Sequence, residues 1–362
     1  MIKKILHITP DFNYSCGRSK LVFLYLKYFG NRDEYETHFI TNGGDSLERL
    51  KEIPSLKFKK LTFSTGIKNI FFYNRFYKTL KDYVIENKIN LIHTHHRFPE
   101  FVSNRIAKEF NLKTITSAHS FVNGFKQISF KSDKIISVSN SVTSYLLKNF
   151  NIKTDKLITL YNPIEEFSEL KPDEKEKIKR EICIKPNQKV LLFMGKINYK
   201  KGYDKLIQAY KIVYNKDKDV ILIMCGKVED KSFTKLRTKL TVPIIIIPPL
   251  KGNNILYQIA QIVILPSRFD GFPFVMIEAG ANKKPFIGGN TGGISEFIED
   301  GLDGLLVNPE NENELADKIL FLLNNKEAAE QLGNNLYKKV NKKCNCNNYF
   351  GRLEEIYNSL IE

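Results

Sequence analysis

The sequence predicts an α/β protein made of two doubly wound domains, each a parallel sheet with helices on both faces. Strand-like and helix-like stretches alternate along the chain in two successive series. A charged segment with prolines near both ends, residues 162–186, separates the two series, as expected of an interdomain connection. A length of 362 residues also suits two domains of ordinary size.

The first series begins with an apolar run at 4–10 and a helix pattern at 21–29. A second, longer helix is predicted over 67–87. Further buried strands are expected where short apolar runs end in small or polar residues, at 35–41, 56–63, 90–95, 112–119, 133–139 and 156–164.

The second series follows a helix predicted at 173–183 within the connection. It contains a helix pattern at 203–215 and strand patterns at 189–195, 220–226, 242–249, 261–265, 285–289 and 304–307. Only helix patterns remain from residue 310 onward. The last of them carries apolar residues on one face, namely Phe350, Leu353, Ile356, Tyr357 and Leu360.

Composition indicates a soluble, cytoplasmic protein. The chain is 42% apolar, its N-terminal apolar run is too short for a signal peptide, and no run approaches the roughly 18 apolar residues of a membrane span. Five cysteines show no metal-binding spacing, and their odd number fits reduced thiols. We therefore expect no metal site.

The net charge of +16 is concentrated in the first half of the chain. Residues 1–165 hold 26 Lys and Arg against 14 Asp and Glu, whereas residues 166–362 hold 30 against 26. The electrostatic field of so many positive charges attracts nucleic acid, anionic lipid or a polyanionic substrate. No zinc finger, RRM signature or helix-turn-helix pattern occurs, so nucleic acid is not an expected partner. The alternative is that the excess of lysine reflects a compositional bias of the genome and has no functional meaning.

Two acidic residues flank the start of a predicted helix near Pro273. Asp270 lies in a polar loop after the strand at 261–265, and Glu278 lies one and a half turns inside the helix. Both can face the crevice at the carboxyl end of the strand, where open α/β sheets bind ligands. Gly271 permits close approach of a ligand, and the helix start favours phosphate. The alternative is a strand–loop–helix unit with two solvated acids.

Two lysines lie between the first predicted strand and the next predicted helix of the second domain. Lys196 follows the strand at 189–195, and Lys201 precedes the helix at 203–215. Two cations at such a position can bracket a diphosphate and stabilise charge that develops on a leaving group. Two solvated lysines before a helix are the alternative.

Histidines recur at strand ends in the first domain. His95 and His96 follow one predicted strand, and His119 follows the next. These histidines are either structural, metal-binding or functional, but no cysteine or carboxylate lies at ligand spacing. The loop after the first strand holds one glycine, Gly17, so the Gly-x-Gly-x-x-Gly fingerprint of nicotinamide enzymes is absent.

These segments resemble the retaining glycosyltransferases of the GT-B fold, glycosyltransferase family 4. Asp270-Gly271-Phe272 and Glu278-Ala279 are similar to the family's Glu-x7-Glu motif, with the first acid shortened. Gly195-Lys196 and Lys201-Gly202 are similar to its Gly-Arg and Lys-Gly pairs, with lysine in place of arginine at 196. The order Gly292-Gly293 and then Glu296 extends the resemblance.

The first half of the chain resembles the family more loosely. Gly17 matches the second glycine of the family's first loop, where Cys16 replaces the first. Segment 90–97, NLIHTHHR, is similar to the family's Asp-x-x-His-x-His strand end.

The resemblance implies two Rossmann-like domains that face a cleft. Residues 1–165 would bind the acceptor, residues 166–345 would bind the donor, and 346–362 would form a helix that crosses back to the first domain. The implied reaction is metal-independent and needs no cofactor. It would transfer a sugar with retention from a nucleotide sugar, with UDP the family's frequent nucleotide, to a saccharide or lipid-linked glycan in cell-surface polysaccharide synthesis.

The resemblance also implies roles for individual residues. Those near the reacting sugar and the leaving diphosphate would be Lys196, Lys201, Asp270 and His119. Glu278 would accept hydrogen bonds from the ribose, and the remaining donor contacts would be Gly17, Gly271, Phe272, Phe274 and Val275. The acceptor side would hold His95, His96 and Arg18.

Two other functions fit the same sequence. A nucleotide-sugar epimerase of this fold would need no acceptor. A non-catalytic scaffold is suggested by the departures at Asp270, Lys196 and Cys16.

A membrane contact is a further hypothesis for helix 67–83. It interleaves aromatic residues with Lys68, Arg75, Lys78 and Lys81, which suits an anionic surface such as the inner face of the plasma membrane. The alternative is an ordinary core helix, because a helix that packs on a sheet needs an apolar face in any case.

Overall fold

A computed structural model describes residues 2–63, 69–237, 240–249, 252 and 254–361. The chain forms two compact units, Met1–Asn162 together with Asn347–Glu362, and Pro163–Cys346. Among the described residues, no helix is both long enough and apolar enough to cross a membrane.

The first unit is built on a parallel sheet whose strands follow the order β3-β2-β1-β4-β5-β6-β7. The order reverses between β1 and β4, which is where doubly wound sheets bind ligands at their carboxyl edge. The strands are β1 (Lys3–Thr9), β2 (Tyr35–Thr41), β3 (Lys57–Lys60), β4 (Leu91–Thr94), β5 (Lys113–Ala118), β6 (Lys134–Ser137) and β7 (Leu157–Thr159).

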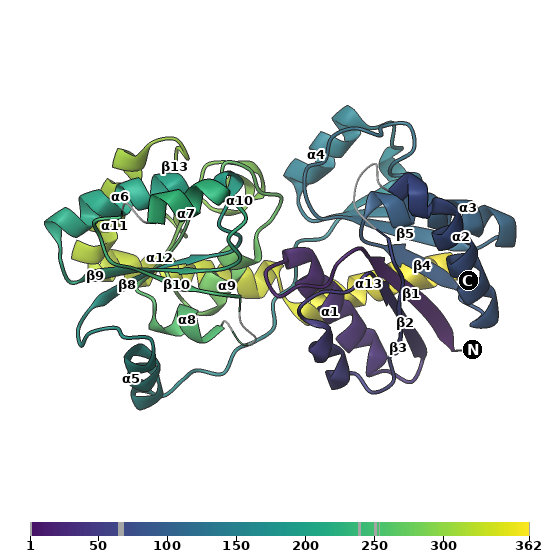
Figure 1. Cartoon of the computed structure of the whole chain (residues 1–362), viewed down its shortest axis with the longest axis horizontal. Helices are drawn as coiled ribbons and strands as arrows, with labels where there is room; N and C mark the ends of the chain where they lie inside the picture. Colours follow the sequence, from purple (N-terminus) through teal and green to yellow (C-terminus); the bar gives the residue numbers. More distant parts are fainter. Residues whose placement is uncertain (1, 64–68, 238–239, 250–251, 253, 362) are drawn as a thin grey trace. The chain divides into compact units, whose positions relative to one another are not determined.

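Helices cover both faces of this sheet because its strands carry buried side chains on both faces. On one face, Leu6, Ile8 and Ile92 pack with α2 (Asn69–Glu86) and α3 (Arg97–Phe110). The other face is covered by α1 (Gly17–Gly30) and by α13 (Cys346–Ile361), the last helix of the chain. Figure 1 shows α13, in yellow, beside the strands of the first unit. The unit also contains α4 (Asn140–Asn149) and the short helices η1 (Leu47–Glu52) and η2 (Thr154–Lys156).

The second unit repeats the design with the strand order β10-β9-β8-β11-β12-β13, which reverses between β8 and β11. Its strands are β8 (Lys189–Met194), β9 (Val220–Cys225), β10 (Ile244–Ile247), β11 (Ile262–Leu265), β12 (Phe286–Gly289) and β13 (Leu305–Val307). Its helices are α5 (Pro172–Glu181), η3 (Tyr199–Lys201), α6 (Tyr203–Lys216), α7 (Lys231–Arg237), α8 (Asn254–Ile259), α9 (Phe274–Ala281), α10 (Gly292–Phe297), α11 (Glu312–Asn324) and α12 (Lys326–Lys343).

The predicted α/β class is confirmed, with every described strand pairing in either sheet parallel. Each predicted strand is present, although most are shorter by a few residues at their ends. Helices α3, α4, α7, α8 and α10 were not predicted. The long helix begins at Asn69, and the predicted residues 67 and 68, including Lys68, lie outside the described residues.

Candidate active site

Three glycines hold the loop that follows β11. A Cβ atom would lie 2.0 Å from the Pro266 carbonyl oxygen if added at Gly202, and 1.8 Å from the Gly271 oxygen if added at Gly293. At Gly289 it would lie 2.2 Å from the Ser267 oxygen. Only glycine permits these contacts, because any Cβ would overlap a backbone atom. The loop that carries Asp270 is therefore held by close backbone packing at Gly202, Gly289 and Gly293.

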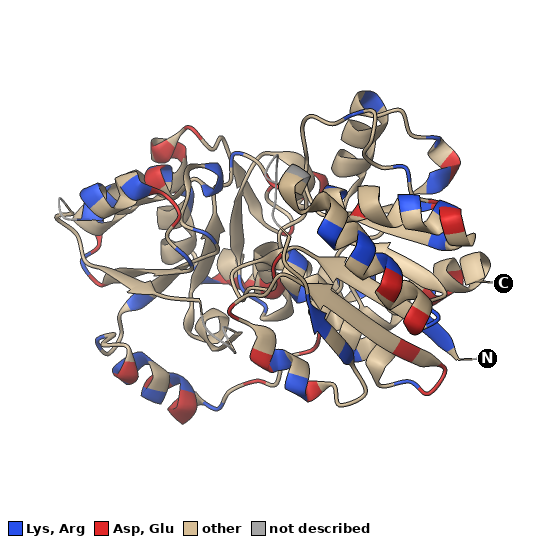
Figure 2. Ribbon diagram, turned by 45° about the vertical axis from the view of Figure 1, so that its right-hand side comes forward, with Lys and Arg blue, Asp and Glu red and all other residues tan. Residues whose placement is uncertain are grey.

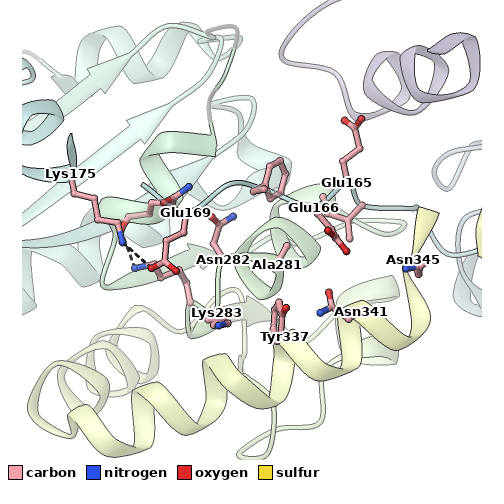
Figure 3. Close-up of a pocket in the computed structure, with 14 residues that line it drawn as sticks. Glu165, Glu166, Glu169, Lys175, Ala281, Asn282, Lys283, Tyr337, Asn341 and Asn345 are labelled. Carbon is pink, nitrogen blue, oxygen red and sulfur yellow. Dashed lines mark hydrogen bonds and ion pairs between the residues drawn. The ribbon is translucent and has the colours of Figure 1, made fainter. Parts of the chain in front are cut away.

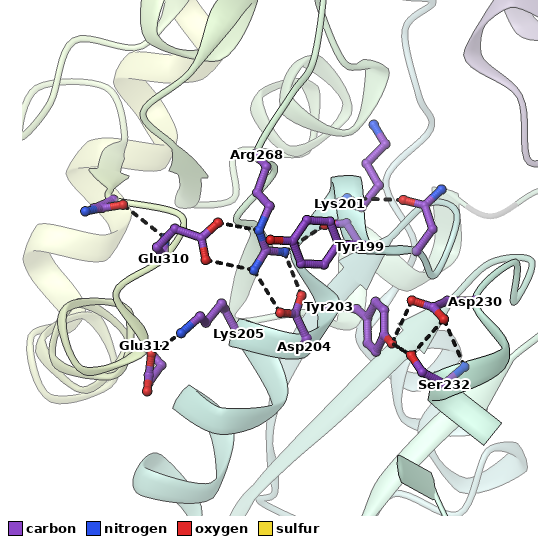
Figure 4. A network of polar contacts seen from close by, with 12 residues as sticks. Tyr199, Lys201, Tyr203, Asp204, Lys205, Asp230, Ser232, Arg268, Glu310 and Glu312 are labelled. Atoms are coloured by element: carbon purple, nitrogen blue, oxygen red, sulfur yellow. Dashed lines mark hydrogen bonds and ion pairs between the residues drawn. The ribbon is translucent and has the colours of Figure 1, made fainter. Parts of the chain in front are cut away.

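Arg268 secures the same loop from within (Figure 4). Its Nη1 and Nη2 donate to the two carboxylate oxygens of Asp204, at 2.7 and 2.8 Å, and its Nη2 donates to Glu310 at 3.1 Å. Nη1 also donates to the Tyr199 carbonyl at 2.7 Å, and the guanidinium lies 3.8 Å from the centre of the Tyr199 ring. Burial opposes the charge, but the hydrogen bonds to Asp204 and Glu310 raise the pKa of Arg268. One side chain thus joins α6, η3 and the segment before α11 to the loop.

Lys201 and Asp270, both predicted as catalytic, form one ion pair. The Lys201 ammonium donates to Asp270 Oδ2, and their side chains are only 23% and 13% exposed. Two further backbone bonds fix them. Lys201 N–H donates to Asn198 Oδ1 at 3.2 Å, and Gly293 N–H donates to the Asp270 carbonyl at 3.1 Å. A cation and an anion are therefore held together at the carboxyl ends of β8 and β11.

Lys196 is also paired, with a residue that the sequence did not indicate. Its ammonium lies 2.7 Å from Glu229 Oε1, and Asn198 Nδ2 donates to Glu229 Oε2 at 2.9 Å. Burial would raise the pKa of Glu229, but the bonds from Lys196 and Asn198 lower it overall. The carboxylate therefore remains an anchor that orients Lys196 beside Gly195, where the backbone adopts φ of +132°.

Helix α9 begins directly after this loop, as the sequence predicted. Pro273 caps it in an extended conformation, and Met276 N–H in the first turn donates to the Pro273 carbonyl at 3.3 Å. The Phe272 ring is buried and lies 5.2 Å from the Phe297 ring, and Phe274 is buried as well. Phe272 and Phe274 can therefore offer a donor only their backbone groups, whereas Val275 is partly exposed.

Glu278 lies in the second turn of α9, where its carboxylate accepts a hydrogen bond from the Tyr257 hydroxyl of α8. Burial and the Glu278 charge raise the pKa of Tyr257 well above its usual value and that of Cys225, at the end of β9, to about 12. Glu278 therefore lies beside α8, and its charge acts on Cys225 at the end of β9. It and Asp270 have different partners, and no signal in the sequence pointed to Tyr257, 21 residues away.

A cavity of about 560 Å³ in the second unit is a separate feature (Figure 3). Its walls come from segment 164–169, from the residues that follow α9 and from α12. Burial and nearby lysines lower the pKa of Lys284, in its wall, to about 8. The cavity adjoins the C-terminal end of α9, whereas Asp270 and Pro273 precede the N-terminal end. It is not the site of the predicted residues.

An Asp-x-Asp triplet, Asp217-Lys218-Asp219, also lies away from these residues. It precedes β9, and so it lies at the amino edge of the sheet rather than the carboxyl edge. Asp217 is already 2.9 Å from the Lys189 ammonium.

In the first unit, strand pairing brings the histidines together. His7 of β1 and His93 of β4 are direct partners across the two strands, and His95 lies two residues further along the same face. His7 Nδ1 and His95 Nε2 are 3.2 Å apart, and His95 Nδ1 and His119 Nε2 are 3.3 Å apart. His93 contacts the Tyr357 hydroxyl at 2.6 Å and Ser117 Oγ at 2.8 Å.

His95, which the sequence predicted on the acceptor side, is buried in the structure. Its side chain is 2% exposed, because the face of the sheet that carries it is covered by α1 and α13. The outer residues of the group remain accessible. His119 and His96 are partly exposed, and Gly17 is exposed at the start of α1. The His96 ring also caps α3, by accepting from Phe98 N–H at 3.4 Å.

Arg18 joins the outer histidines at this edge of the sheet. Its Nη2 donates to Asp11 Oδ2 at 2.6 Å, which balances its charge. Burial, with Arg18 as an additional cause, lowers the pKa of His119 to about 3 and that of His96 to about 4. Burial also lowers the pKa of His7 to about 3 and those of His93 and His95 well below the usual value. All five rings are therefore neutral at pH 7.

Among the described residues, His7, His93 and His95 have the geometry closest to a metal site. One ring nitrogen from each lies within 4.8 Å of the others. However, both nitrogens of His93 have hydrogen-bond partners, and the facing nitrogens of His7 and His95 point at each other. These contacts fit a hydrogen-bonded cluster better than a ligand set.

Comparison with known proteins assigns both halves of the chain. The family described as Glycosyltransferase Family 4 matches residues 24–166, and that described as Glycosyl transferases group 1 matches residues 174–339. An uncharacterised glycosyltransferase of Methanocaldococcus jannaschii is 26% identical over 76% of this chain and 77% of its own length. The N-acetyl-alpha-D-glucosaminyl L-malate synthase of Bacillus anthracis is 25% identical over 90% of each. A capsular polysaccharide biosynthesis glycosyltransferase of Staphylococcus aureus is 27% identical over 48% of this chain and 47% of its own.

Solved structures show the same fold. A glycosyltransferase from Rickettsia africae superposes with a TM-score of 0.85 at 23% identity, covering 100% of this chain and 99% of that one. HepE of Anabaena in complex with UDP-glucose superposes with a TM-score of 0.84 at 15% identity, covering 99% and 100%. The two family matches together span most of the chain, and both parallel sheets have their counterparts in these structures. The chain belongs to family 4 of the glycosyltransferases and has their GT-B fold.

Proposed function

We propose that this glycosyltransferase transfers a sugar from a UDP-sugar to a saccharide or lipid-linked glycan, with retention and without a metal, in the synthesis of a cell-surface polysaccharide. The observation that carries the proposal is the Lys201–Asp270 ion pair beside the start of α9. The capsular relative from Staphylococcus aureus supports the acceptor class, and the UDP-glucose bound by HepE supports the donor.

Lys201 is the residue we assign to the leaving diphosphate. Its ammonium already lies against a carboxylate, so phosphate oxygens can join or replace Asp270 without the lysine first losing a full water shell. Lys196, held by Glu229, would supply a second positive charge. First-turn N–H groups of α9, such as that of Val275, would complete the phosphate site, although Pro273 contributes no N–H.

Glu278 is the residue we assign to the ribose. Tyr257 donates to one carboxylate oxygen, which fixes the orientation of the group, and the carboxylate would accept hydrogen bonds from the sugar hydroxyls. Gly271, beside Asp270, would let the donor approach the loop backbone.

Asp270 suits a positioning role better than nucleophilic attack. Its Oδ2 is bonded to Lys201, so the carboxylate is weakened as a nucleophile but can accept a hydrogen bond from the transferred sugar. Retention would then follow from departure of the diphosphate and attack of the acceptor on the same face. His119, His96 and Arg18 of the first unit would contact the sugars, with Gly17 allowing close approach.

We also propose a peripheral membrane contact through α2. Phe71 is 86% exposed, and Arg75 and Lys78 are exposed nearby. Lys81, in contrast, is paired with Glu109 of α3 at 2.7 Å, and the opposite face of α2 packs in the core. Sedimentation with anionic vesicles at low salt should fall when Phe71, Arg75 and Lys78 are replaced by alanine. An absence of wild-type binding to such vesicles contradicts the contact.

The activity is tested with a panel of nucleotide sugars. Slow release of the nucleotide from one donor, accelerated by a saccharide or lipid-linked acceptor, is the expected result. Formation of an epimer without acceptor would instead show a nucleotide-sugar epimerase, and no turnover or binding of any donor would indicate a non-catalytic scaffold.

A further inference from the structure

Three imidazole rings in the first unit form a continuous chain from its interior to the edge of the sheet. His7 Nδ1 faces His95 Nε2 at 3.2 Å, and His95 Nδ1 faces His119 Nε2 at 3.3 Å. The His7 and His95 ring planes differ by only 13°, with centres 5.5 Å apart. The His95 and His119 ring centres are 5.4 Å apart, with planes that differ by 39°. In both pairs the nitrogens face each other between the ring edges, so each contact is an N–H···N hydrogen bond.

Proton counting restricts this chain to two arrangements. Burial keeps all three rings neutral at pH 7, so each ring carries one proton. His95 must therefore donate in one of its bonds and accept in the other. Either all three rings carry the proton on Nδ1, or all three carry it on Nε2, and one ring cannot change unless the others change as well.

The surroundings of the two chain ends favour the Nε2–H arrangement. At the outer end, Arg18 acts electrostatically on His119, and its buried Nε–H has no hydrogen-bond partner among the described residues. A donor that lacks an acceptor at that end favours a lone pair on His119 Nδ1 over an N–H at the same atom. Within the described part of the chain, the hydrogen bond of His119 is made by Nε2 and not by Nδ1.

At the inner end, the His7 Nε2 atom is buried without a hydrogen-bond partner among the described residues. The rings of Tyr25 and His93 pack against the His7 ring, with centres 5.6 and 5.3 Å from its own. Aromatic faces accept N–H groups weakly but offer nothing to a lone pair. The Nε2–H form is thus preferred at both ends.

We propose that His7 and His95 are positioning residues that hold His119 as the Nε2–H tautomer, so that its Nδ1 lone pair accepts a hydrogen bond from a substrate hydroxyl. Within the chain, His119 Nε2–H donates to His95 Nδ1, and His95 Nε2–H donates to His7 Nδ1. The contact with a substrate rests on the proposed function, whereas the tautomer does not.

His93 is adjacent to this chain but outside it. Its ring stacks on that of His95 with centres 4.4 Å apart, yet its two nitrogens contact Tyr357 and Ser117. Its tautomer is therefore set by those two hydroxyls, independently of His119.

The tautomers are measured by NMR on the full-length protein labelled with 15N in its histidine rings, because the chemical shifts of the two ring nitrogens show which one carries the proton. The wild-type protein should show Nε2–H at His7, His95 and His119. His7→Phe fills the space but removes the final acceptor, so the chain should reverse and His119 should become Nδ1–H. The matched control is His38→Phe, which removes a buried histidine of β2 that contacts Tyr83 and Glu36, and it should leave His119 unchanged.

Three results would overturn the proposal: Nδ1–H at His119 in the wild type, no response of His119 to a folded His7→Phe variant, or stoichiometric zinc bound to the cluster. If His7→Phe does not fold, the wild-type tautomers alone decide. With the donor found in the nucleotide-sugar panel, His7→Phe should lower kcat/KM about tenfold, the effect of one lost hydrogen bond, while His38→Phe should change it less than about twofold. The NMR result stands even if no donor is turned over.

Discussion

Lys201 and Asp270 act as a pair, and this decides how substitutions at either residue should be interpreted. Removing the lysine leaves a carboxylate that is 13% exposed without its cation, and so creates negative charge where a diphosphate would bind. Removing the carboxylate frees the ammonium to move. A loss of activity in either variant therefore reports both the missing group and the changed behaviour of the group that remains.

We expect Lys201→Ala to lower turnover more than any other single change in the site. The lysine is assigned to charge that grows as the diphosphate leaves, so kcat should fall by about 100- to 1,000-fold. Steady-state rates at saturating donor measure this. The control is Lys205→Ala, which breaks an ion pair with Glu312 in the same unit, 2.7 Å long, and should keep kcat within about twofold. Unchanged turnover of Lys201→Ala would eliminate the role assigned to this lysine.

Glu278→Ala should instead weaken donor binding. Hydrogen bonds to a charged group contribute about 1.5–3 kcal/mol, which corresponds to a rise of about 10- to 100-fold in the Kd for UDP. Calorimetric titration with UDP measures it. Tyr257→Phe removes the hydroxyl that orients the carboxylate and should have a smaller effect in the same direction. A lower kcat with an unchanged Kd would contradict a ribose contact.

At the scale of elements, the loop between β11 and α9 is positioned by groups far away in the sequence. Arg268 bonds Asp204 and Glu310, which are 64 and 42 residues away, while Gly202 and Gly293 allow backbone to pack directly on the loop. The geometry of Asp270 therefore depends on α6, α10 and the segment before α11 as well as on its own loop.

Arg268→Lys should loosen that loop. Lysine keeps the charge but cannot bond both oxygens of Asp204 and reach Glu310 at once. With a side chain 10% exposed, the loss should cost about 1–3 kcal/mol in the free energy of unfolding of the second unit. Chemical denaturation measures the stability, and the KM for the donor should rise in parallel. Wild-type stability together with a wild-type KM would show that the network does not position the loop.

The elements themselves follow from local sequence, which is why they could be predicted. Apolar runs such as 189–194 and 220–225 are buried on both faces of a parallel sheet, and the start of α9 follows the Pro273 signal. Helix α3 was not predicted, because His96, a residue outside the usual capping set, caps it.

The site could be predicted only in part. The lysines, acids and glycines of the second unit stand in short motifs, whereas their partners Glu229 and Tyr257 are separated from them by tens of residues. His95 was assigned to the acceptor side from the resemblance of segment 90–97 to the family's strand end, but α13, more than 200 residues later, covers the face of the sheet that carries it. Contacts of this length leave no local pattern in a sequence.

At the scale of the whole molecule, the two units differ in their response to acid. Acidic and basic residues lie on the helices of both units (Figure 2). The histidines, in contrast, all lie in the first unit. In the first unit, burial lowers the pKa of each histidine below its value of about 6.5 in the unfolded chain. The stabilisation by neutral histidines is therefore complete above pH 6.5 and is lost as the pH falls below it.

The first unit should accordingly lose stability between pH 6.5 and 5 while the second does not. A fully buried histidine such as His7 costs about 1.4 kcal/mol for each pH unit below 6.5, until its folded pKa is reached. Glu100, whose pKa burial raises, opposes this trend, but it is outnumbered. Hydrogen exchange of the full chain, corrected for the intrinsic rate at each pH, should show protection falling in residues 2–162 and persisting in 163–346. An equal loss of protection in both units would contradict the claim that the buried histidines cause the acid sensitivity of the first unit.

The most direct test of the proposed reaction is to follow it by proton NMR in EDTA, using the donor and acceptor found in the panel. The nucleotide should be released at the same rate with and without the chelator, and the anomeric proton of the new glycoside should have the coupling constant of the configuration present in the donor. Loss of activity in EDTA that added metal restores, or a product of inverted configuration, would contradict it.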